Sequence, residues 1–309
     1  MRDTFISELS NFAEIDPNII LITGDLGFGV LNDYINNFPN QYINAGVAEQ
    51  NMTGIATGLG LEGKTVFTYS IGNFNTLRCL EQIRNDACYH EVNVNIISVG
   101  GGFSYGPLGY SHHATEDIAI IRALPNIQVF TPSDDWEVKQ IVKNMVAHEG
   151  VSYLRIDKSF APSTSSLDEV FKAGKARILK EGKDLSLLAC GGILDLALKA
   201  SEYFEKQGIN IRVVSVHSIN PFDKNIVIDC ASNTGGIITL EEHSLSGGLG
   251  SLVCETLVKN NILPEKFFSM GLESKFSTIV GTQDYLRDIN GIGLESIKQN
   301  IRSLLSLDS

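Results

Sequence analysis

The sequence lacks the features of nucleic-acid-binding, secreted and membrane-spanning proteins. Lysine and arginine total 24 against 36 acidic residues, which gives a net charge of −12, and no basic run is longer than a pair. Nucleic acids and anionic membranes are bound through clustered positive charge, so we expect neither as a partner. No apolar stretch reaches the ~20 residues that cross a bilayer, and the first residues do not resemble a signal peptide. These absences predict a cytoplasmic protein.

Cysteine is scarce and is never arranged in a CxxC pair. The chain has an odd number of widely spaced cysteines: Cys79, Cys88, Cys190, Cys230 and Cys254. Zinc sites need closely spaced ligands, and disulfide frameworks need paired cysteines. The pattern therefore predicts reduced, mostly buried thiols and no metal site within this chain. Internal repeats and low-complexity tracts are also missing.

The sequence does contain a regular alternation of apolar runs and amphipathic helical stretches. Strands separated by helices form parallel sheets with helices on both faces, so the predicted fold class is α/β with two parallel-sheet domains. A chain of 309 residues is long enough for two cores. We expect a first domain at residues 1–160, a polar linker at 161–180, and a second, smaller domain at 181–309.

Two segments of the predicted first domain lie next to the candidate functional residues. Residues 74–89 have helical spacing and are predicted to form one helix after a strand at Thr65–Tyr69. The segment 100–113 is rich in glycine and longer than an ordinary connection between a strand and a helix. Loops of that kind are usually functional or mobile.

Ionisable residues fall at predicted strand ends and helix starts. Glu49 begins a helix among small and apolar neighbours, Asp25 follows the first strand in a glycine-rich turn, and His112 and His113 end the long loop. A buried carboxylate is costly unless partnered, so Glu49 is a candidate for proton transfer, with partnering of the helix dipole as the alternative. The histidines could be catalytic, solvated or capping, and Asp25 is also a common turn residue.

Longer segments, in chain order, resemble the carboxyl-terminal half of transketolases and their relatives, the deoxyxylulose-phosphate synthases and the beta subunits of pyruvate-type dehydrogenases. The first domain carries GDLG at 24–27, GVAEQNM at 46–52, FTYSIGNF and EQIRND within 67–86, and GYSHHATEDIAIIRALPNIQVFTPSD at 109–134. The second carries VVSVHSINPFD at 213–223 and LEEHSLSGGLG at 240–250. The resemblance implies a thiamine-diphosphate pyrimidine-binding domain followed by a transketolase C-terminal domain.

The resemblance implies thiamine diphosphate as the cofactor and assigns residues to it. In this family the glutamate at the position of Glu49 hydrogen-bonds a ring nitrogen of the aminopyrimidine and so activates the cofactor. Phe74 aligns with an aromatic residue that stacks on the pyrimidine, with a plain core role as the alternative, and Ile71 lies one turn earlier. Asp25 and Leu26 match a segment that lies against the cofactor.

At the substrate end, the resemblance assigns proton transfer and oxygen binding to His112. Arg155 matches an arginine that contacts a substrate phosphate, for which a salt bridge to a neighbouring carboxylate is the alternative. Arg2 is a further candidate for phosphate binding. His113 has no counterpart and is expected to shape the loop.

Two polar residues with which transketolases contact sugar hydroxyls are missing, since their places correspond to Gly100 and to Gly109 or Leu108. This departure argues against ordinary pentose-phosphate transketolase activity. Recognition by the loop is then expected from its remaining polar and aromatic residues: Ser104, Tyr105, Tyr110 and Ser111. In the second domain, Glu241, Glu242 and His243 are expected to be structural.

The family's Gly-Asp-Gly segment with its distant Asn, which binds the diphosphate and Mg²⁺ or Ca²⁺, is also missing, because Gly24-Asp25-Leu26 differs at the third position. The resemblance therefore implies a split enzyme whose partner chain supplies the diphosphate and metal site, in an α2β2 assembly. The expected reaction moves a two-carbon ketol unit between sugar-type substrates. Decarboxylation of a 2-oxo acid with carboligation or acyl transfer is one alternative, and a non-catalytic stabilising subunit is another.

Overall fold

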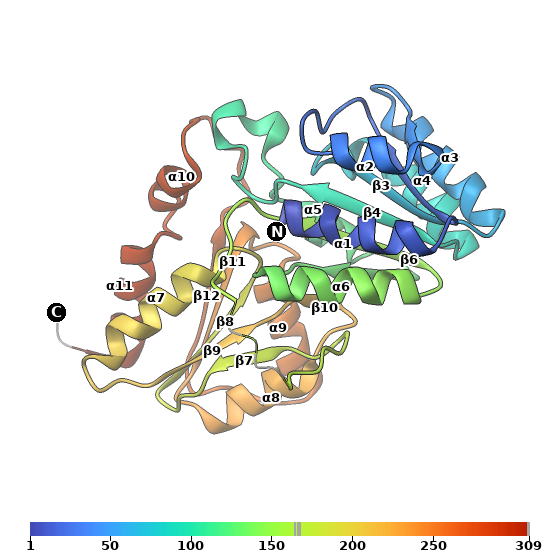
Figure 1. Cartoon of the computed structure of the whole chain (residues 1–309). Coiled ribbons are helices and arrows are strands. Elements are labelled where there is room, and N and C mark those ends of the chain that lie inside the picture. The colour runs from blue at the N-terminus through green and yellow to red at the C-terminus, as the bar shows by residue number, and fades with distance from the viewer. Residues whose placement is uncertain (164, 166–167, 308–309) are drawn as a thin grey trace.

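The structure is a computed structural model that describes residues 1–163, 165 and 168–307, and it consists of two α/β halves in contact (Figure 1). Each half is a sheet covered by helices on both faces, so the predicted α/β class with two sheets is confirmed. Thr164, Ser166 and Leu167 of the predicted linker lie outside the described residues. No helix within those residues is both long and apolar enough to cross a membrane.

The sheet of the first half has seven strands in the order β10-β5-β6-β4-β3-β1-β2, of which only β10 is antiparallel to its neighbour. Its strands, in chain order, are β1 (Ile19–Thr23), β2 (Tyr42–Asn44), β3 (Thr65–Ile71), β4 (Val94–Val99), β5 (Ile127–Phe130), β6 (Val151–Ile156) and β10 (Ser218–Asn220). Parallel strands end at the same edge, so the turns after β1, β3, β4 and β6 lie together.

The helices of the first half cover the two faces of this sheet. They are α1 (Arg2–Ile15), α2 (Asn32–Asn37), α3 (Glu49–Leu61), α4 (Leu80–Gln82), α5 (Asp117–Ile121) and α6 (Asp135–Ala147). Figure 1 shows α1 and α6 side by side on one face, where Phe5 and Ile141 share a core with Leu21 of β1. Ile20 and Ile22 point to the other face and pack with Met52 of α3, as the two-residue repeat of a strand requires.

The sheet of the second half has five strands in the order β12-β11-β8-β9-β7, with β7 antiparallel. The strands are β7 (Arg177–Lys180), β8 (Leu185–Cys190), β9 (Ile211–Ser215), β11 (Ile237–Ser244) and β12 (Phe267–Leu272). Its helices are α7 (Leu194–Glu205), α8 (Lys224–Asn233), α9 (Leu249–Lys259), α10 (Gln283–Ile289) and α11 (Leu294–Leu305).

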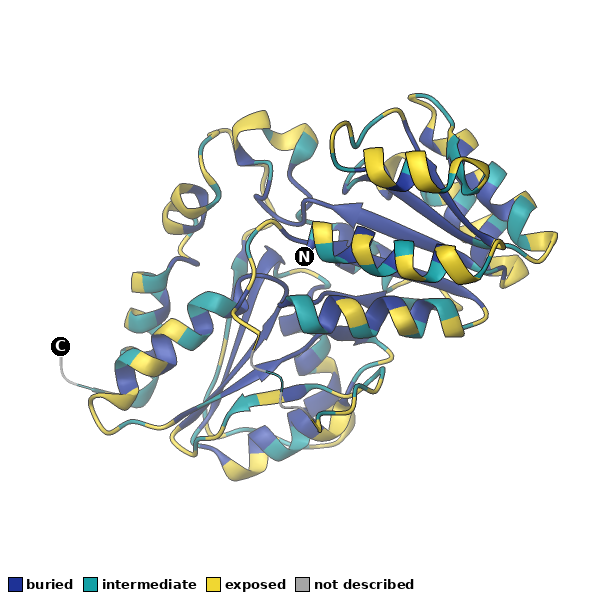
Figure 2. Cartoon of the chain, viewed as in Figure 1, coloured by how far each residue is buried: buried dark blue, intermediate teal, exposed yellow. Residues whose placement is uncertain are grey.

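The two halves are joined by a shared sheet and a shared apolar core. Strand β10 belongs to the second half of the chain but pairs with β5 of the first sheet. One apolar cluster also runs through both halves, from Ile22 and Met52 to Val214 and Val253. Figure 2 shows buried strands between helices whose outer faces are exposed. Because apolar surface is buried across the junction, the two sheets are held in a fixed relation.

Both sheets are mainly parallel, as predicted, and each adds one short antiparallel strand. Both antiparallel members, β7 and β10, lie at sheet edges and have only 4 and 3 residues. Strand β7 covers the last four residues of the predicted linker 161–180, and it pairs with β9 of the second sheet. Such short edge strands carry too few alternating residues for a sequence pattern to identify them.

The helix predicted at residues 74–89 begins later than predicted and is irregular. The chain turns sharply after β3, and regular helix is replaced by a short 3₁₀ turn at Leu77–Cys79, α4, and a π-helical segment at Ile83–Cys88. Asn75 is buried and donates from Nδ2 to the carbonyls of Thr68 (3.3 Å) and Ile97 (3.0 Å). These bonds tie the turn to the sheet, and π-helical turns of this kind often mark functional sites.

The cysteines agree with the prediction of reduced, mostly buried thiols. All five are free, four of them are buried, and Cys254 is half-buried. Burial raises the pKa of the Cys79 thiol to about 11 and that of Cys88 to about 12. Such thiols behave as small apolar side chains.

Candidate active site

Glu49 is buried at the start of α3, where its carboxylate has one basic partner. The Glu49 side chain is 1 % exposed, and its Oε2 lies 2.6 Å from Nη1 of Arg78, whose side chain is 43 % exposed. Gly24 packs against this carboxylate, since a Cβ on Gly24 would lie 3.3 Å from Glu49 Oε1. The partner explains how a carboxylate is tolerated there. Arg78 is a partner that the sequence did not indicate.

The turns around Glu49 are held by Asn44. Its Oδ1 accepts from the backbone N–H of Asp25 (3.1 Å) and of Gly46 (2.9 Å), and its Nδ2 donates to Asp25 Oδ1 (2.9 Å). Asp25 adopts a left-handed backbone conformation with φ of 57°, which Asp tolerates better than most residues. Asp25 therefore acts as a turn residue that joins the ends of β1 and β2. Leu26 beside it is half-buried against the core.

Phe74 lies next to Arg78 in the turn after β3. The turn starts at Ile71, whose carbonyl accepts from the backbone N–H of Phe74 at 2.9 Å. The guanidinium carbon of Arg78 is 4.4 Å from the centroid of the Phe74 ring, and the ring centroid of His112 is 5.2 Å from it. Glu49, Arg78, Phe74 and His112 thus form a continuous row, although they come from three separate segments.

The loop 100–113 is closed at its base and folded over this row. Gly102 and Ala114 exchange two backbone hydrogen bonds of 2.7 and 3.1 Å, and two 3₁₀ turns lie between them, at Gly106–Leu108 and Tyr110–His112. Nδ2 of Asn73 donates to the carbonyls of Ser111 (3.2 Å) and His113 (2.9 Å). These bonds fix the end of the loop beside Phe74.

The two histidines of the loop differ in their surroundings. His112 is half-buried, and its Nδ1 lies 3.0 Å from Ser111 Oγ. Partial burial, together with repulsion from His113, lowers the pKa of His112, which favours the neutral ring. His113 is buried, and its Nε2 lies 3.1 Å from the carbonyl of Gly106. Its position fits the expectation that His113 shapes the loop.

A cavity of about 360 Å³ opens between the two halves beside this row. Phe74, Arg78 and Tyr110 line it from the first half, and Lys275 and Phe276 line it from the second. The rings of Tyr110 and Phe276 are 6.0 Å apart and meet across the cavity. The cavity combines apolar walls with charged side chains of both signs, since Glu116 and Glu273 line it together with Arg78 and Lys275. A mainly apolar wall with a few polar groups is typical of small-molecule sites.

Tyr105 links this region to a second hollow of about 380 Å³. Its ring centroid is 6.4 Å from that of His112, and Nζ of Lys158 lies 4.0 Å from the Tyr105 centroid. Arg2 lines the same hollow, and the pKa of Lys158 is lowered by partial burial and by the Arg2 charge. Tyr105 also fills the space of a side chain at Gly100, where a Cβ would lie 2.2 Å from the ring.

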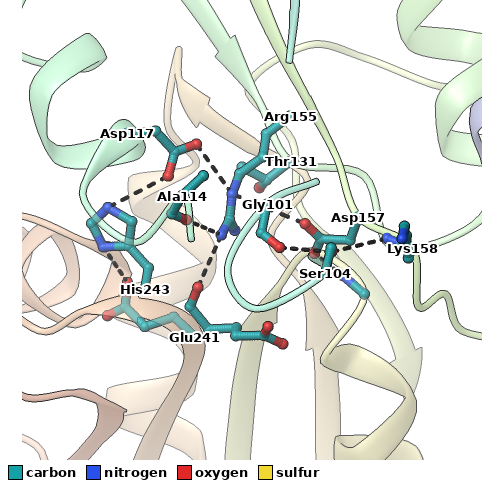
Figure 3. A network of polar contacts seen from close by, with 12 residues as sticks. Gly101, Ser104, Ala114, Asp117, Thr131, Arg155, Asp157, Lys158, Glu241 and His243 are labelled. Carbon is teal, nitrogen blue, oxygen red and sulfur yellow. Dashed lines mark hydrogen bonds and ion pairs between the residues drawn. The ribbon is translucent and has the colours of Figure 1, made fainter. Parts of the chain in front are cut away.

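Arg155 does not reach either hollow, which corrects its assignment to substrate binding. The side chain is 1 % exposed, and Nε lies 3.1 Å from Asp117 Oδ2 and 4.0 Å from Asp157 Oδ1 (Figure 3). Its Nη2 donates to the carbonyls of Ala114 (3.1 Å) and Glu242 (2.9 Å). A buried cation needs such partners, and they leave the guanidinium enclosed between the halves. The salt-bridge alternative describes this residue.

The Glu241–His243 segment, expected to be structural, lies buried in the same junction. Glu241 accepts from the backbone N–H groups of Leu249 (2.7 Å) and Gly250 (2.8 Å) at the start of α9. Burial raises the pKa of Glu241 to about 7 and lowers that of His243 to about 4. Nδ1 of His243 lies 2.7 Å from the carbonyl of Ser244. Neither residue lines the cavities described above.

Three residues that sequence reasoning missed complete the site: Arg78, Asn73 and Lys158. Arg78 follows Phe74 by four residues, and one helical turn of separation could have suggested that the two side chains are neighbours. Lys158 lies just past the carboxyl end of β6, which is where α/β sheets place ligand-binding residues. Asn73 could not have been singled out, because its role depends on the fold of a distant loop.

Comparison with known proteins identifies the two halves. Residues 1–163 match the family model of the transketolase pyrimidine-binding domain, and residues 174–287 match that of the transketolase C-terminal domain. The chain belongs to the transketolase family. The resemblance seen in its motifs is therefore confirmed, and membership of this family implies thiamine diphosphate as the cofactor.

Relatives of this transketolase-family chain include separately encoded subunits. It is 37 % identical to an apulose-4-phosphate transketolase subunit of Phocaeicola vulgatus over 84 % of each chain. A solved structure titled "Split gene transketolase, inactive beta4 tetramer" shares 35 % identity and a TM-score of 0.89, covering 100 % of this chain and 99 % of that one. The 1-deoxy-D-xylulose-5-phosphate synthase of Desulforudis audaxviator is 31 % identical over 89 % of this chain, but the match spans only 43 % of that enzyme. A transketolase-type transferase subunit is thus the identity that these relatives support.

Proposed function

We propose that this chain is the pyrimidine-binding subunit of a two-chain, thiamine-diphosphate-dependent transketolase that moves a two-carbon ketol unit between sugar phosphates. The observation that carries the proposal is the row formed by Glu49, Arg78, Phe74 and His112 at the carboxyl edge of the first sheet. The row supports the proposal, because a buried carboxylate, an aromatic ring and a histidine would be within reach of one small molecule.

The residues present fit the aminopyrimidine of the cofactor. Between Glu49 and Phe74 lies the guanidinium of Arg78, a flat group that donates to the carboxylate and stacks near the ring. An aminopyrimidine is also flat and also carries nitrogen donors. Glu49 and Phe74 would hold it, with Asp25, Leu26 and Ile71 at the same edge. When bound, thiamine diphosphate supplies a thiazolium carbon that makes and breaks carbon–carbon bonds next to a carbonyl.

His112 would bind the oxygen atoms of the substrate and move a proton to or from them. Because its lowered pKa favours the neutral ring, it can accept a proton near neutral pH. Ser111 engages Nδ1, so Nε2 is the nitrogen that would meet the substrate. Tyr105, whose ring lies beside His112, would form the wall on the far side.

The substrate phosphate is assigned to Arg2 and Lys158 in place of Arg155. Both cations line the hollow that Tyr105 shares with the site, and the charge of Arg2 is close enough to lower the pKa of Lys158. Two neighbouring cations suit a phosphate group. By their names, two of the relatives act on apulose 4-phosphate and form 1-deoxy-D-xylulose 5-phosphate, respectively. Both compounds are phosphorylated.

A partner chain would carry the diphosphate and the metal ion. Among residues 1–163, 165 and 168–307, no group of three His, Cys, Asp or Glu side chains is placed to hold a metal. The related beta4 tetramer is described as inactive, which fits a chain that needs a second kind of subunit. We propose an α2β2 assembly in the cytoplasm with a diphosphate-binding transketolase subunit.

Glu49→Gln in the complex reconstituted with that partner tests the proposal. Removing a group that works in proton transfer is expected to lower kcat by about a hundredfold or more. Size-exclusion chromatography should show unchanged assembly, because Glu49 contacts Arg78 of its own chain. Glu62→Gln at the other, exposed end of α3 is the matched control and should keep full activity. Full activity in the Glu49→Gln complex would refute the role and favour a non-catalytic subunit.

The donor distinguishes ketol transfer from the decarboxylation alternative. The complex is expected to consume a ketose phosphate in the presence of an aldose phosphate acceptor and to release no carbon dioxide from pyruvate. Chromatography of the sugar phosphates and trapping of labelled carbon dioxide measure the two reactions. Consumption of pyruvate without ketose phosphate turnover would establish the alternative.

A further inference from the structure

Glu242, at the junction between the halves, is the one member of the Glu241–His243 segment whose side chain contacts the histidine-bearing loop. Its Oε1 accepts from the backbone N–H of Phe103 at 2.5 Å, and its carboxylate also accepts from Gln283 Nε2 (3.0 and 3.1 Å) and from Arg287 Nε (2.5 Å). The side chain is 1 % exposed. A fully buried carboxylate that accepts four hydrogen bonds has little freedom to move.

The main chain of Glu242 holds the opposite end of the same loop. Its carbonyl accepts from Arg155 Nη2 at 2.9 Å, and the same Nη2 donates to the carbonyl of Ala114 at 3.1 Å. Ala114 in turn is bonded to Gly102, so both ends of the loop converge on one residue of the second half. The approach is close, because a Cβ on Gly102 would lie 2.5 Å from Glu242 Oε1.

Phe103 connects Glu242 to the histidines, because its backbone N–H bonds to Glu242 and its ring contacts His113. Its ring meets that of buried His113 edge-on at 5.1 Å between centroids. His113 lies next to His112 in the chain, and Asn73 holds the carbonyls on either side of His112. A shift of Phe103 would therefore move the segment that places the His112 ring beside Phe74.

We propose that Glu242 is a positioning residue for the transfer reaction: it fixes both ends of the loop 100–113 from the second half of the chain and so sets the place of His112. This inference rests on the proposed function, because it takes His112 as the group that meets the substrate. It assigns a task to the second half beyond packing. Arg287 supports Glu242 and is itself held by Ser159, to which its Nη2 donates at 2.7 Å.

Glu242→Ala and Glu242→Gln, compared with Glu255→Gln, form the test. Glu255 makes another ion pair across the same junction, with Arg122 (2.6 Å), but contacts no residue of the loop. Hydrogen exchange of residues 100–113 is measured on the full chain, and kcat and KM are measured on the reconstituted complex. Cofactor affinity is measured by calorimetry.

Glu242→Ala should lose about tenfold or more of the amide protection in 100–113 and about 10- to 100-fold in kcat, because small displacements of reacting groups are that costly. Cofactor affinity should stay within about twofold, since Glu49 and Phe74 belong to other elements. Glu242→Gln keeps an oxygen for Phe103 and should recover much of both losses. Glu255→Gln should resemble the unaltered chain in both measurements.

Unchanged loop protection in Glu242→Ala would overturn the inference, as would an equal loss in Glu255→Gln, which would point to general loosening of the junction. Lost protection with unchanged kcat would overturn the link between the loop and the reaction. Failure of the proposed function would give a different result. The unaltered complex would then show no ketol transfer, while hydrogen exchange on the chain would still show that Glu242→Ala exposes the amides of residues 100–113.

Discussion

Two buried carboxylates of this chain, Glu49 and Glu242, are equally shielded from solvent but differ in their partners. Each side chain is 1 % exposed. Glu49 has one charged partner, Arg78, which is 43 % exposed and borders a cavity. Glu242 is held by three donors from two segments, and its charged partner, Arg287, is 3 % exposed. Burial of a carboxylate therefore says little about its role. An exposed partner such as Arg78 can be replaced by a ligand, whereas a buried partner such as Arg287 cannot leave without breaking the packing.

The cavity edge around Glu49 and the junction around Glu242 differ in the same way. At the cavity edge, Glu49 and Arg78 pair with each other, and a ligand could replace this single contact. In the junction, the buried guanidinium of Arg155 contacts two carboxylates and two backbone carbonyls (Figure 3). Charges in the first region are suited to binding, and those in the second to holding the halves in register.

Arg155→Met should produce the largest change in stability. It removes the cation from Asp117 and Asp157 and leaves two buried carboxylates short of a partner. Breaking a buried pair typically costs about 3–5 kcal/mol. Urea denaturation followed by circular dichroism measures the loss. Stability equal to that of the unaltered chain would show that the junction is solvated and that the contrast between the regions is wrong.

Lys158→Met should weaken recognition of phosphorylated donors without weakening the complex. Loss of one partly exposed cation near a phosphate is expected to raise KM by roughly tenfold, which corresponds to about 1.4 kcal/mol. Lys180→Met is the control, because Lys180 pairs with Glu205 at 2.9 Å and lines neither hollow. Steady-state kinetics with a ketose phosphate measures both variants. Equal KM values for the two would remove Lys158 from the phosphate site.

Much of the fold could be predicted, because long strands and helices carry clear periodicity and the motifs cover nearly the whole chain. Glu49 and His112 can be singled out from their places at a helix start and a loop end, and Phe74 from the resemblance, and the three side chains lie in one row with Arg78. The sequence indicates only that Arg155 lies near the carboxyl end of a strand. Its burial depends on Asp117, which belongs to a helix elsewhere in the chain, and the sequence does not reveal that contact. The break after β3 depends likewise on Asn75 bonding to two strands.

Glu241→Gln should alter how stability depends on pH. Glu241 has its pKa raised from 4.5 to about 7, so the folded chain binds the extra proton and stability falls as pH rises through this range. His243 has its pKa lowered from 6.5 to about 4, so stability rises with pH between those values. The two slopes oppose each other in the unaltered chain.

In Glu241→Gln, only His243 of this pair still makes stability depend on pH. Denaturation midpoints should then increase with pH between about 4 and 6.5 more steeply than in the unaltered chain. Urea titrations at several pH values provide the measurement. An unchanged slope would mean that Glu241 does not titrate in the folded state as its burial requires.

Glu49→Gln should have the smallest effect on stability, in contrast to its effect on turnover. It leaves Arg78 without its carboxylate, but this guanidinium is accessible to water. Loss of an ion pair with one accessible partner is expected to cost about 1 kcal/mol or less. The denaturation midpoint, compared with that of Arg155→Met, measures the difference. A loss as large as that of Arg155→Met would place Glu49 among the residues that hold the fold together.

The most direct test of the central claim is the transfer assay with the reconstituted two-chain complex. The chain is mixed with a diphosphate-binding transketolase subunit, thiamine diphosphate and Mg²⁺, and is given a ketose phosphate donor and an aldose phosphate acceptor. We expect a product that is two carbons longer than the acceptor, formed by the complex and not by either chain alone. Transfer by one chain alone, or no transfer by a complex that has assembled and bound the cofactor, would contradict the account.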